Sequence, residues 1–281
     1  MVNFNGEITH NEKLLMASNR GFAFGDALFE TIKVSHSKIL FWEDHYFRLM
    51  ASMRIMRMEI PMNFTMEYLS SEILKTIEAN SLIDKTVRVK LSVFRNSTGL
   101  YLPKNNDVKY IITTKELDED FYLINDEPYE LDLFKDYFIA PNLLSTIKSN
   151  NKLINVVGSI YAKENGLQNC LLMNTNKQVI EALNGNVFVV KGNTIKTPAL
   201  EHGCLKGILR KQLIEIINSI PDYDLDESAI SPFELQKADE IFITNVISGI
   251  QPVSKYRKKK YSSAIAKDLI GKINARVRLV N

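Results

Sequence analysis

Strand-like and helix-like segments alternate through both halves of this 281-residue chain, and that alternation constrains the fold more than any other feature. Residues 87–94 form a run rich in β-branched side chains, which is typical of a strand. Residues 43–58 carry apolar side chains at helical spacing, which predicts an amphipathic helix. A chain that alternates in this way belongs to the α/β (α+β) class.

The same patterns place the other elements. In the first half they predict a hairpin of residues 31–34 and 39–41, a helix over residues 65–79 and a strand over residues 109–113. In the second half they predict strands over residues 130–139, 170–174, 187–190, 195–197 and 240–245, and helices over residues 152–165, 205–218 and 262–277.

An acidic segment divides the chain. Residues 116–127 are rich in Asp and Glu and are followed by Pro128, a composition typical of a linker. A chain of 281 residues is long enough for two domains. We therefore expect an N-terminal domain over residues 1–117, a linker over residues 118–127 and a C-terminal domain over residues 128–281.

The composition is that of a globular protein, with 45% hydrophobic and 24% charged residues. The net charge of +2 gives no reason to expect nucleic acid or a membrane surface as a partner. Residues 1–12 lack the pattern of a signal peptide, and no stretch reaches the ~18 apolar residues of a membrane span. Cys170 and Cys204, the only cysteines, are expected to be reduced thiols in the cytoplasm. The four histidines show no metal-ligand spacing, so no metal is expected.

A basic run near the C-terminus allows two interpretations. It consists of Lys255, Arg257, Lys258, Lys259 and Lys260. Such a run can bind nucleic acid, but we expect a solvated turn between two strands here.

Lys148 is the first candidate for chemistry. It lies in S-T-I-K-S-N-N-K-L-I-N-V, where a strand end is expected to lead into a helix. A lysine at an element end inside a pocket can lose its proton and act as a nucleophile. On these grounds alone, Lys148 could equally be a solvated surface residue. Lys152, four positions later, is a rival nucleophile.

Four further motifs accompany Lys148. Glu181 begins the stretch E-A-L-N-G-N-V-F, and Gly207 opens a predicted helix whose free N–H groups and dipole favour phosphate. Arg48 lies in H-Y-F-R-L, on the first predicted helix, and residues 19–31 read N-R-G-F-A-F-G-D-A-L-F-E-T. Taken singly, each of these residues could be an ordinary surface or turn residue.

Together the motifs resemble those of the class IV aminotransferases, the fold-type IV pyridoxal-phosphate enzymes. The resemblance covers nearly the whole chain and implies two domains, an N-terminal α/β sandwich and a C-terminal barrel-like α/β domain. It implies pyridoxal 5'-phosphate as the cofactor, held in the cleft between the domains. It also implies a small-molecule amino substrate and a homodimer in which the partner's N-terminal domain helps to close the pocket.

The resemblance assigns a role to each motif. Lys148 is the lysine that binds the cofactor covalently and serves as general base, and Glu181 pairs with the pyridine nitrogen so that the ring can accept electrons. The remaining cofactor-binding residues that it implies are Arg48, Asn186, Gly207, Ile208, Leu209, Asn245 and Val246. The chain departs from the family pattern at Leu183 and Asn184, which puts the substrate side of the pocket in doubt.

Within the family, three local features favour 4-amino-4-deoxychorismate lyase, which eliminates pyruvate and leaves p-aminobenzoate for folate biosynthesis. Leu209 and the run Asn245-Val246-Ile247 resemble the lyase, because transaminases carry hydroxyl residues there. Arg95 resembles a lyase arginine and is a candidate ligand for a substrate carboxylate, with Tyr101 nearby. A branched-chain or D-amino-acid aminotransferase is the alternative activity. A catalytically idle, cofactor-binding relative is the alternative from another class.

Overall fold

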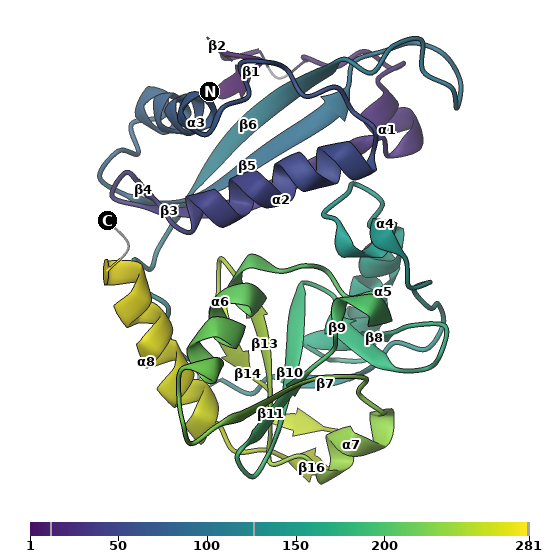
Figure 1. Ribbon diagram of the computed structural model, residues 1–281, viewed down its shortest axis with the longest axis vertical. Helices are drawn as coiled ribbons and strands as arrows, with labels where there is room; N and C mark the ends of the chain where they lie inside the picture. The colour runs from purple at the N-terminus through teal and green to yellow at the C-terminus, as the bar shows by residue number, and fades with distance from the viewer. Residues whose placement is uncertain (12, 126, 280–281) are drawn as a thin grey trace. The chain divides into compact units, whose positions relative to one another are not determined.

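The computed structural model describes residues 1–11, 13–125 and 127–279. The chain forms two compact units (Figure 1). Unit 1 comprises Met1–Asp120 and Ile147–Asn151, and unit 2 comprises Phe121–Thr146 and Lys152–Asn281. The boundary after Asp120 falls within the predicted linker. The return of residues 147–151 to unit 1 is a feature that the continuous domain ranges expected from the sequence do not contain.

Unit 1 is an antiparallel sheet of six strands in the order β2-β1-β6-β5-β3-β4. The strands are β1 Val2–Phe4, β2 Glu7–Thr9, β3 Ala27–Ser35, β4 Lys38–Ile39, β5 Thr86–Arg95 and β6 Val108–Leu117. The helices are α1 Arg20–Phe24, α2 Trp42–Ile55 and α3 Met66–Ala79.

Helices α2 and α3 cover one face of this sheet (Figure 1). Leu49 and Met53 of α2 and Ile73 of α3 are buried against apolar side chains of the central strands. Thr65 caps α3 by accepting the Tyr68 N–H, which fixes where the helix begins. The other face of the same strands is therefore turned away from this core, because side chains alternate along a strand.

Residues 147–151 extend the sheet beside β3. Ser149 pairs with Leu28 in an antiparallel bridge. The Phe29 N–H donates to the Lys148 carbonyl at 2.8 Å, and the Asn150 N–H donates to the Ala27 carbonyl at 2.9 Å. Lys148 therefore lies opposite Phe29 in the sheet, and their side chains share one face.

Unit 2 is built on a mixed ten-stranded sheet in which β10 pairs with β9, β11 and β13. The strands are β7 Glu130–Leu133, β8 Asn169–Met173, β9 Val179–Ala182, β10 Gly185–Lys191, β11 Thr194–Thr197, β12 Asp224–Glu227, β13 Glu240–Asn245, β14 Gly249–Pro252, β15 Lys255–Tyr256 and β16 Lys259–Lys260. The helices are α4 Leu143–Thr146, α5 Leu153–Glu164, the 3-10 turn η1 Leu200–His202, α6 Ile208–Asn218, α7 Pro232–Lys237 and α8 Ala264–Leu279.

Most predicted elements exist, and the differences have local causes. The strand expected over residues 130–139 ends at Leu133, because residues 135–138 are exposed and leave the ladder before Ile139 rejoins β8. The basic run forms β15 and β16 with a turn between them, as expected. Within the described part of the chain, no helix has the length and hydropathy needed to cross a membrane.

Candidate active site

Lys148 places its ammonium group against an aromatic ring in unit 1. Its Nζ lies 4.6 Å from the centroid of the Phe29 ring, on the sheet face opposite the helical core. The rival nucleophile Lys152 instead occupies the N-cap position of α5 in unit 2. Pairing with β3 therefore fixes the backbone of Lys148 in unit 1, whereas Lys152 lies at the start of α5 in unit 2.

Arg48 is held by the buried carboxylate of Glu30. Its Nε donates to Oε1 of Glu30 at 2.8 Å, and its Nη2 bonds the other carboxylate oxygen. That second oxygen, Oε2, also lies 2.7 Å from Nδ1 of His45. All three side chains are buried. The network, formed by Glu30, His45 and Arg48 and called here the Glu30 network, orients the guanidinium that the sequence predicts to contact phosphate.

The electrostatics of the Glu30 network fix its protonation. Burial alone would raise the pKa of Glu30, but Arg48 and His45 outweigh burial and lower this pKa to about 2. Burial lowers the pKa of His45, so the ring is neutral at pH 7 and its Nδ1–H donates to Glu30. The His45 Nε2 atom has no hydrogen-bond partner among the described residues. Sequence reasoning missed Glu30 and His45, although both lie in the motifs F-E-T and H-Y-F-R-L.

In unit 2, Glu181 and Asn186 both form hydrogen bonds with the backbone of Leu205, which precedes α6. They are paired in register on β9 and β10. Oε2 of Glu181 accepts the Leu205 N–H at 2.8 Å, and Nδ2 of Asn186 donates to the Leu205 carbonyl at 2.8 Å. We call these three residues the Leu205 clasp. The clasp explains why the helix expected from residue 205 begins only at Ile208.

The start of α6 presents backbone donors. Gly207 is its N-cap with no side-chain cap, and the first intrahelical bond runs from the Lys211 N–H to the Gly207 carbonyl. The preceding amides, including those of Ile208 and Leu209, are not used within the helix. A Cβ on Gly207 would lie 1.9 Å from Oδ1 of Asn186, so only glycine fits against the clasp here.

A buried hydroxyl lies near this helix start. Thr244 pairs in register with Asn186, so both side chains are on the same sheet face. The Thr244 Oγ1 atom is buried and has no hydrogen-bond partner among the residues that the structure describes. An unsatisfied buried hydroxyl beside free helix N–H groups indicates a place for a polar ligand.

The loop after β13 is held by hydrogen bonds to the side chain of Asn245, the last residue of that strand. Oδ1 of Asn245 accepts the N–H groups of Ile247 and Ser248, each at 3.0 Å. The hydroxyl of Tyr122 donates to the Val246 carbonyl at 2.8 Å, and burial raises the Tyr122 pKa so that the phenol keeps its proton. The loop therefore presents the partly exposed apolar side chains of Val246 and Ile247.

Arg95 and Tyr101 lie in different settings. The guanidinium of Arg95 is buried and bonds Asp26, Asn106 and the carbonyls of Met56 and Arg57. A substrate carboxylate would have to displace these contacts, which argues against the role predicted for Arg95. Tyr101 is 88% exposed, and its ring packs against that of Phe24.

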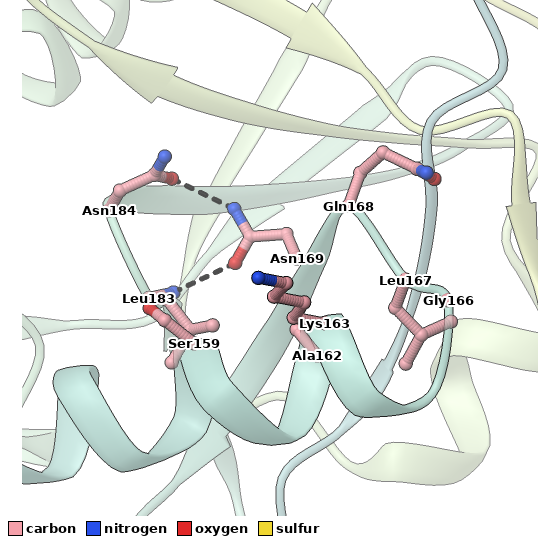
Figure 2. Close-up of a pocket in the computed structure, with 9 residues that line it drawn as sticks. All are labelled: Ser159, Ala162, Lys163, Gly166, Leu167, Gln168, Asn169, Leu183 and Asn184. Carbon is pink, nitrogen blue, oxygen red and sulfur yellow. Dashed lines mark hydrogen bonds between the residues drawn. The ribbon is translucent and has the colours of Figure 1, made fainter.

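Leu183 is accommodated by a glycine. A Cβ on Gly158 of α5 would lie 2.4 Å from Cδ2 of Leu183, so the leucine fills the space that Gly158 leaves. Oδ1 of Asn184 accepts a hydrogen bond from the side-chain amide of Asn169 at 2.8 Å. Asn184 also lines a cavity of about 400 Å³ beside Lys163 (Figure 2). The two departures from the family pattern therefore pack within unit 2.

No group of three or more metal-ligating side chains occurs in the described ranges.

A family model described as amino-transferase class IV matches residues 27–256. The D-alanine aminotransferase of Listeria innocua is 26% identical over 88% of this chain and 84% of its own. The aminodeoxychorismate lyase of Vibrio harveyi is 23% identical over 84% of this chain and 85% of its own. The solved branched-chain aminotransferase of Thermoproteus uzoniensis superposes with a TM-score of 0.88 at 20% identity, covering 98% of this chain and 94% of its own.

Proposed function

Since the chain belongs to the class IV aminotransferase family, whose enzymes depend on pyridoxal phosphate, we propose that it is a 4-amino-4-deoxychorismate lyase. Its family, its fold class and its cofactor are as predicted from the sequence motifs. The activity within the family is the part that we propose.

Each unit carries features that fit the cofactor. In unit 2, the uncapped start of α6, the cradle at Gly207 and the unsatisfied hydroxyl of Thr244 suit a phosphate group. Glu181 would hold the pyridine nitrogen, since its carboxylate is fixed by the Leu205 clasp. In unit 1, Arg48 would supply a charged donor and Lys148 the covalent link. When bound, the cofactor supplies an electron sink for the carbon next to the substrate amine.

The chain's own residues then move one proton. Lys148 takes the proton from the carbon that bears the amino group. The bond between the ring carbon and the ether oxygen of the enolpyruvyl group breaks, and that oxygen leaves with the electron pair as the enolate of pyruvate. The enolate takes up the proton from Lys148 and becomes pyruvate, while the ring leaves as p-aminobenzoate. The Phe29 ring beside Lys148 and the hydrogen bonds between Glu30 and Arg48 hold the Lys148 and Arg48 side chains in place.

The loop of residues 245–248 is the feature that favours a lyase over an aminotransferase. It offers Val246 and Ile247 where transaminases carry hydroxyls, and Asn245 already binds the amides of Ile247 and Ser248. An apolar lining suits an aromatic product such as p-aminobenzoate. Overall similarity does not distinguish the two activities, because the Vibrio harveyi lyase is 23% identical and the Listeria innocua aminotransferase 26% identical, so the choice rests on this loop.

An aminotransferase is the second candidate, because the Listeria innocua relative at 26% identity carries that activity in its name. Product analysis decides between the two. We expect purified, cofactor-loaded protein to convert 4-amino-4-deoxychorismate into equal amounts of p-aminobenzoate and pyruvate. If neither product forms while the lysine-bound cofactor absorbs normally, the lyase proposal fails and amino-donor screening follows. A protein that shows no such absorbance would be the idle relative.

We further propose that the enzyme works as a cytoplasmic homodimer. The two free, buried cysteines suit a reducing compartment. Sedimentation of the purified protein at micromolar concentration tests the dimer, and a monomer with full activity would contradict it.

A further inference from the structure

The basic run of residues 255–260 takes no part in the candidate active site. It forms a hairpin in which a tight turn at Arg257 and Lys258 joins β15 to β16. Arg257 has a φ of 54°, a left-handed conformation that glycine adopts readily and that strains a residue with a side chain. The chain therefore keeps a cation at a turn position where glycine would be less strained. We call residues 255–260 the basic hairpin.

Two cations of the basic hairpin are bound by carboxylates of β7. Nζ of Lys255 lies 2.7 Å from Oε2 of Glu130, and Nε of Arg257 lies 3.2 Å from Oδ1 of Asp132. These pairs follow the parallel register of β15 with β7. Together with the buried ring of Tyr256, they hold the hairpin against the core of unit 2.

The other three cations of the basic hairpin are not neutralised in this way. Among the described residues, no carboxylate forms an ion pair with Lys258, Lys259 or Lys260. Asp239 is close enough for Lys259 to lower its pKa, but its carboxylate already binds a backbone N–H and the Lys191 ammonium, which lower that pKa more. Clustered like charges repel one another, and a bound anion would relieve the repulsion.

A cavity of about 400 Å³ is bordered by the basic hairpin and α7. The Tyr261 hydroxyl, which follows β16, donates to the Leu235 carbonyl at 2.6 Å and so holds α7 beside the hairpin (Figure 1). Within the part of the chain that the structure describes, neither Asp nor Glu lines this cavity. Its lining residues are Gln236, Tyr256, Arg257, Lys258 and Lys259.

The lining indicates the class of ligand. Two ammonium groups, a guanidinium and a side-chain amide offer N–H donors, which suit the oxygens of a doubly charged phosphate group. The volume is that of a site for a small molecule. Nucleic acid fits less well, because the Tyr256 ring at the cavity is buried and offers no face on which a base can stack.

We propose that this cavity binds a small phosphate-bearing molecule. None of the residues that line it is a candidate for binding the cofactor or the substrate, so the site is additional to the one that contains Glu181 and Gly207. The proposal goes beyond the proposed function and holds for either reaction, lyase or aminotransferase.

Calorimetry with inorganic pyrophosphate tests the proposal. The protein is loaded with its cofactor, so that the cofactor's own phosphate site is filled, and salt at about 0.15 M suppresses weak surface attraction. We expect saturable binding of a single pyrophosphate per chain. Lys258→Gln and Lys259→Gln should each weaken this binding roughly fivefold or more, and Lys258→Arg should preserve it.

Two further variants separate a defined site from diffuse charge. Lys260→Gln removes the same charge from the same hairpin at a position that does not line the cavity, so we expect a loss of about twofold or less. Gln236→Ala removes a donor without changing the charge, so the affinity should fall about threefold. Unchanged cofactor absorbance and thermal unfolding midpoints show that each variant is folded.

Three results would overturn the proposal. They are the absence of saturable pyrophosphate binding, binding that neither Lys258→Gln nor Lys259→Gln weakens, and equal losses in Lys258→Gln and Lys260→Gln with none in Gln236→Ala. Vesicles of anionic phospholipid and single-stranded RNA are titrated in parallel. Binding of either one by protein that does not bind pyrophosphate would also overturn the proposal and would assign the basic hairpin to a membrane surface or to nucleic acid.

Discussion

The Glu30 network of unit 1 and the Leu205 clasp of unit 2 hold their candidate residues by different means. In unit 1, a buried carboxylate fixes a charged side chain, Arg48, through direct ion pairing. In unit 2, side chains grip the backbone at Leu205, and the donors that result are main-chain N–H groups of α6. The stability of the Glu30 network depends on the charges of its side chains and therefore on pH. The geometry of the Leu205 clasp depends on how closely its side chains and the backbone fit together. Substitutions can therefore separate the two.

The largest effect is expected at Lys148, the proposed nucleophile. Lys148→Ala should lower kcat by about 10²–10⁴-fold or more and abolish the covalent cofactor link, because it removes both the nucleophile and the base. Borohydride trapping and peptide mapping measure the link. Lys152→Ala serves as the control and should keep both. A trapped adduct at Lys152 in the Lys148→Ala protein would reverse the assignment.

Removing the charge of Glu30 tests the side of the comparison that depends on charge. Glu30→Gln should lower the free energy of unfolding by about 3–5 kcal/mol, because Arg48 is left buried without its counter-charge. Urea denaturation at pH 7 measures the loss. Glu59→Gln changes an exposed carboxylate and should have almost no effect. Equal losses in the two variants would refute the role of the network.

The pH dependence of stability sharpens the same point. The pKa of Glu30 falls from 4.5 to about 2 on folding, so the unfolded chain binds the proton first as pH decreases. Its contribution is complete above pH 4.5 and disappears between pH 4.5 and 2. The lowered pKa of His45 adds a loss that begins below pH 6.5. Unfolding midpoints at pH 7, 5 and 3.5 should fall progressively, and less steeply below pH 4.5 in Glu30→Gln.

A smaller effect is expected where shape matters. Gly207→Ala should weaken cofactor binding roughly tenfold, because the added methyl group collides with Asn186 and shifts the start of α6. Titration of the apoprotein with pyridoxal phosphate measures this. Gly271→Ala, which meets no atom within 4 Å in α8, should bind the cofactor normally. An unchanged affinity in Gly207→Ala would show that α6 contributes little to the site.

The sequence motifs contain the candidate site residues but do not reveal the partners of those residues. Glu181 and Asn186 lie in one motif and Gly207 in a later one, and the structure brings all three to the backbone around Leu205. The partners of Arg95 could not be predicted, because Asp26 is 69 residues away and carries no signal of the pairing. The pairing of Lys148 with Phe29 of β3 joins residues still farther apart, 119 positions (148 − 29). Such contacts follow from strand register, which a single sequence specifies only through local alternation.

The segment of residues 147–151, which bridges to β3, has a consequence for dividing the gene. A fragment of residues 1–120 would lack it and would bare the backbone donors and acceptors of Ala27 and Phe29. Bare strand edges recruit other chains and promote aggregation. The segment that carries Lys148, the proposed nucleophile, thus also protects this sheet from misassembly, and the two units cannot be inherited or shuffled as separate modules.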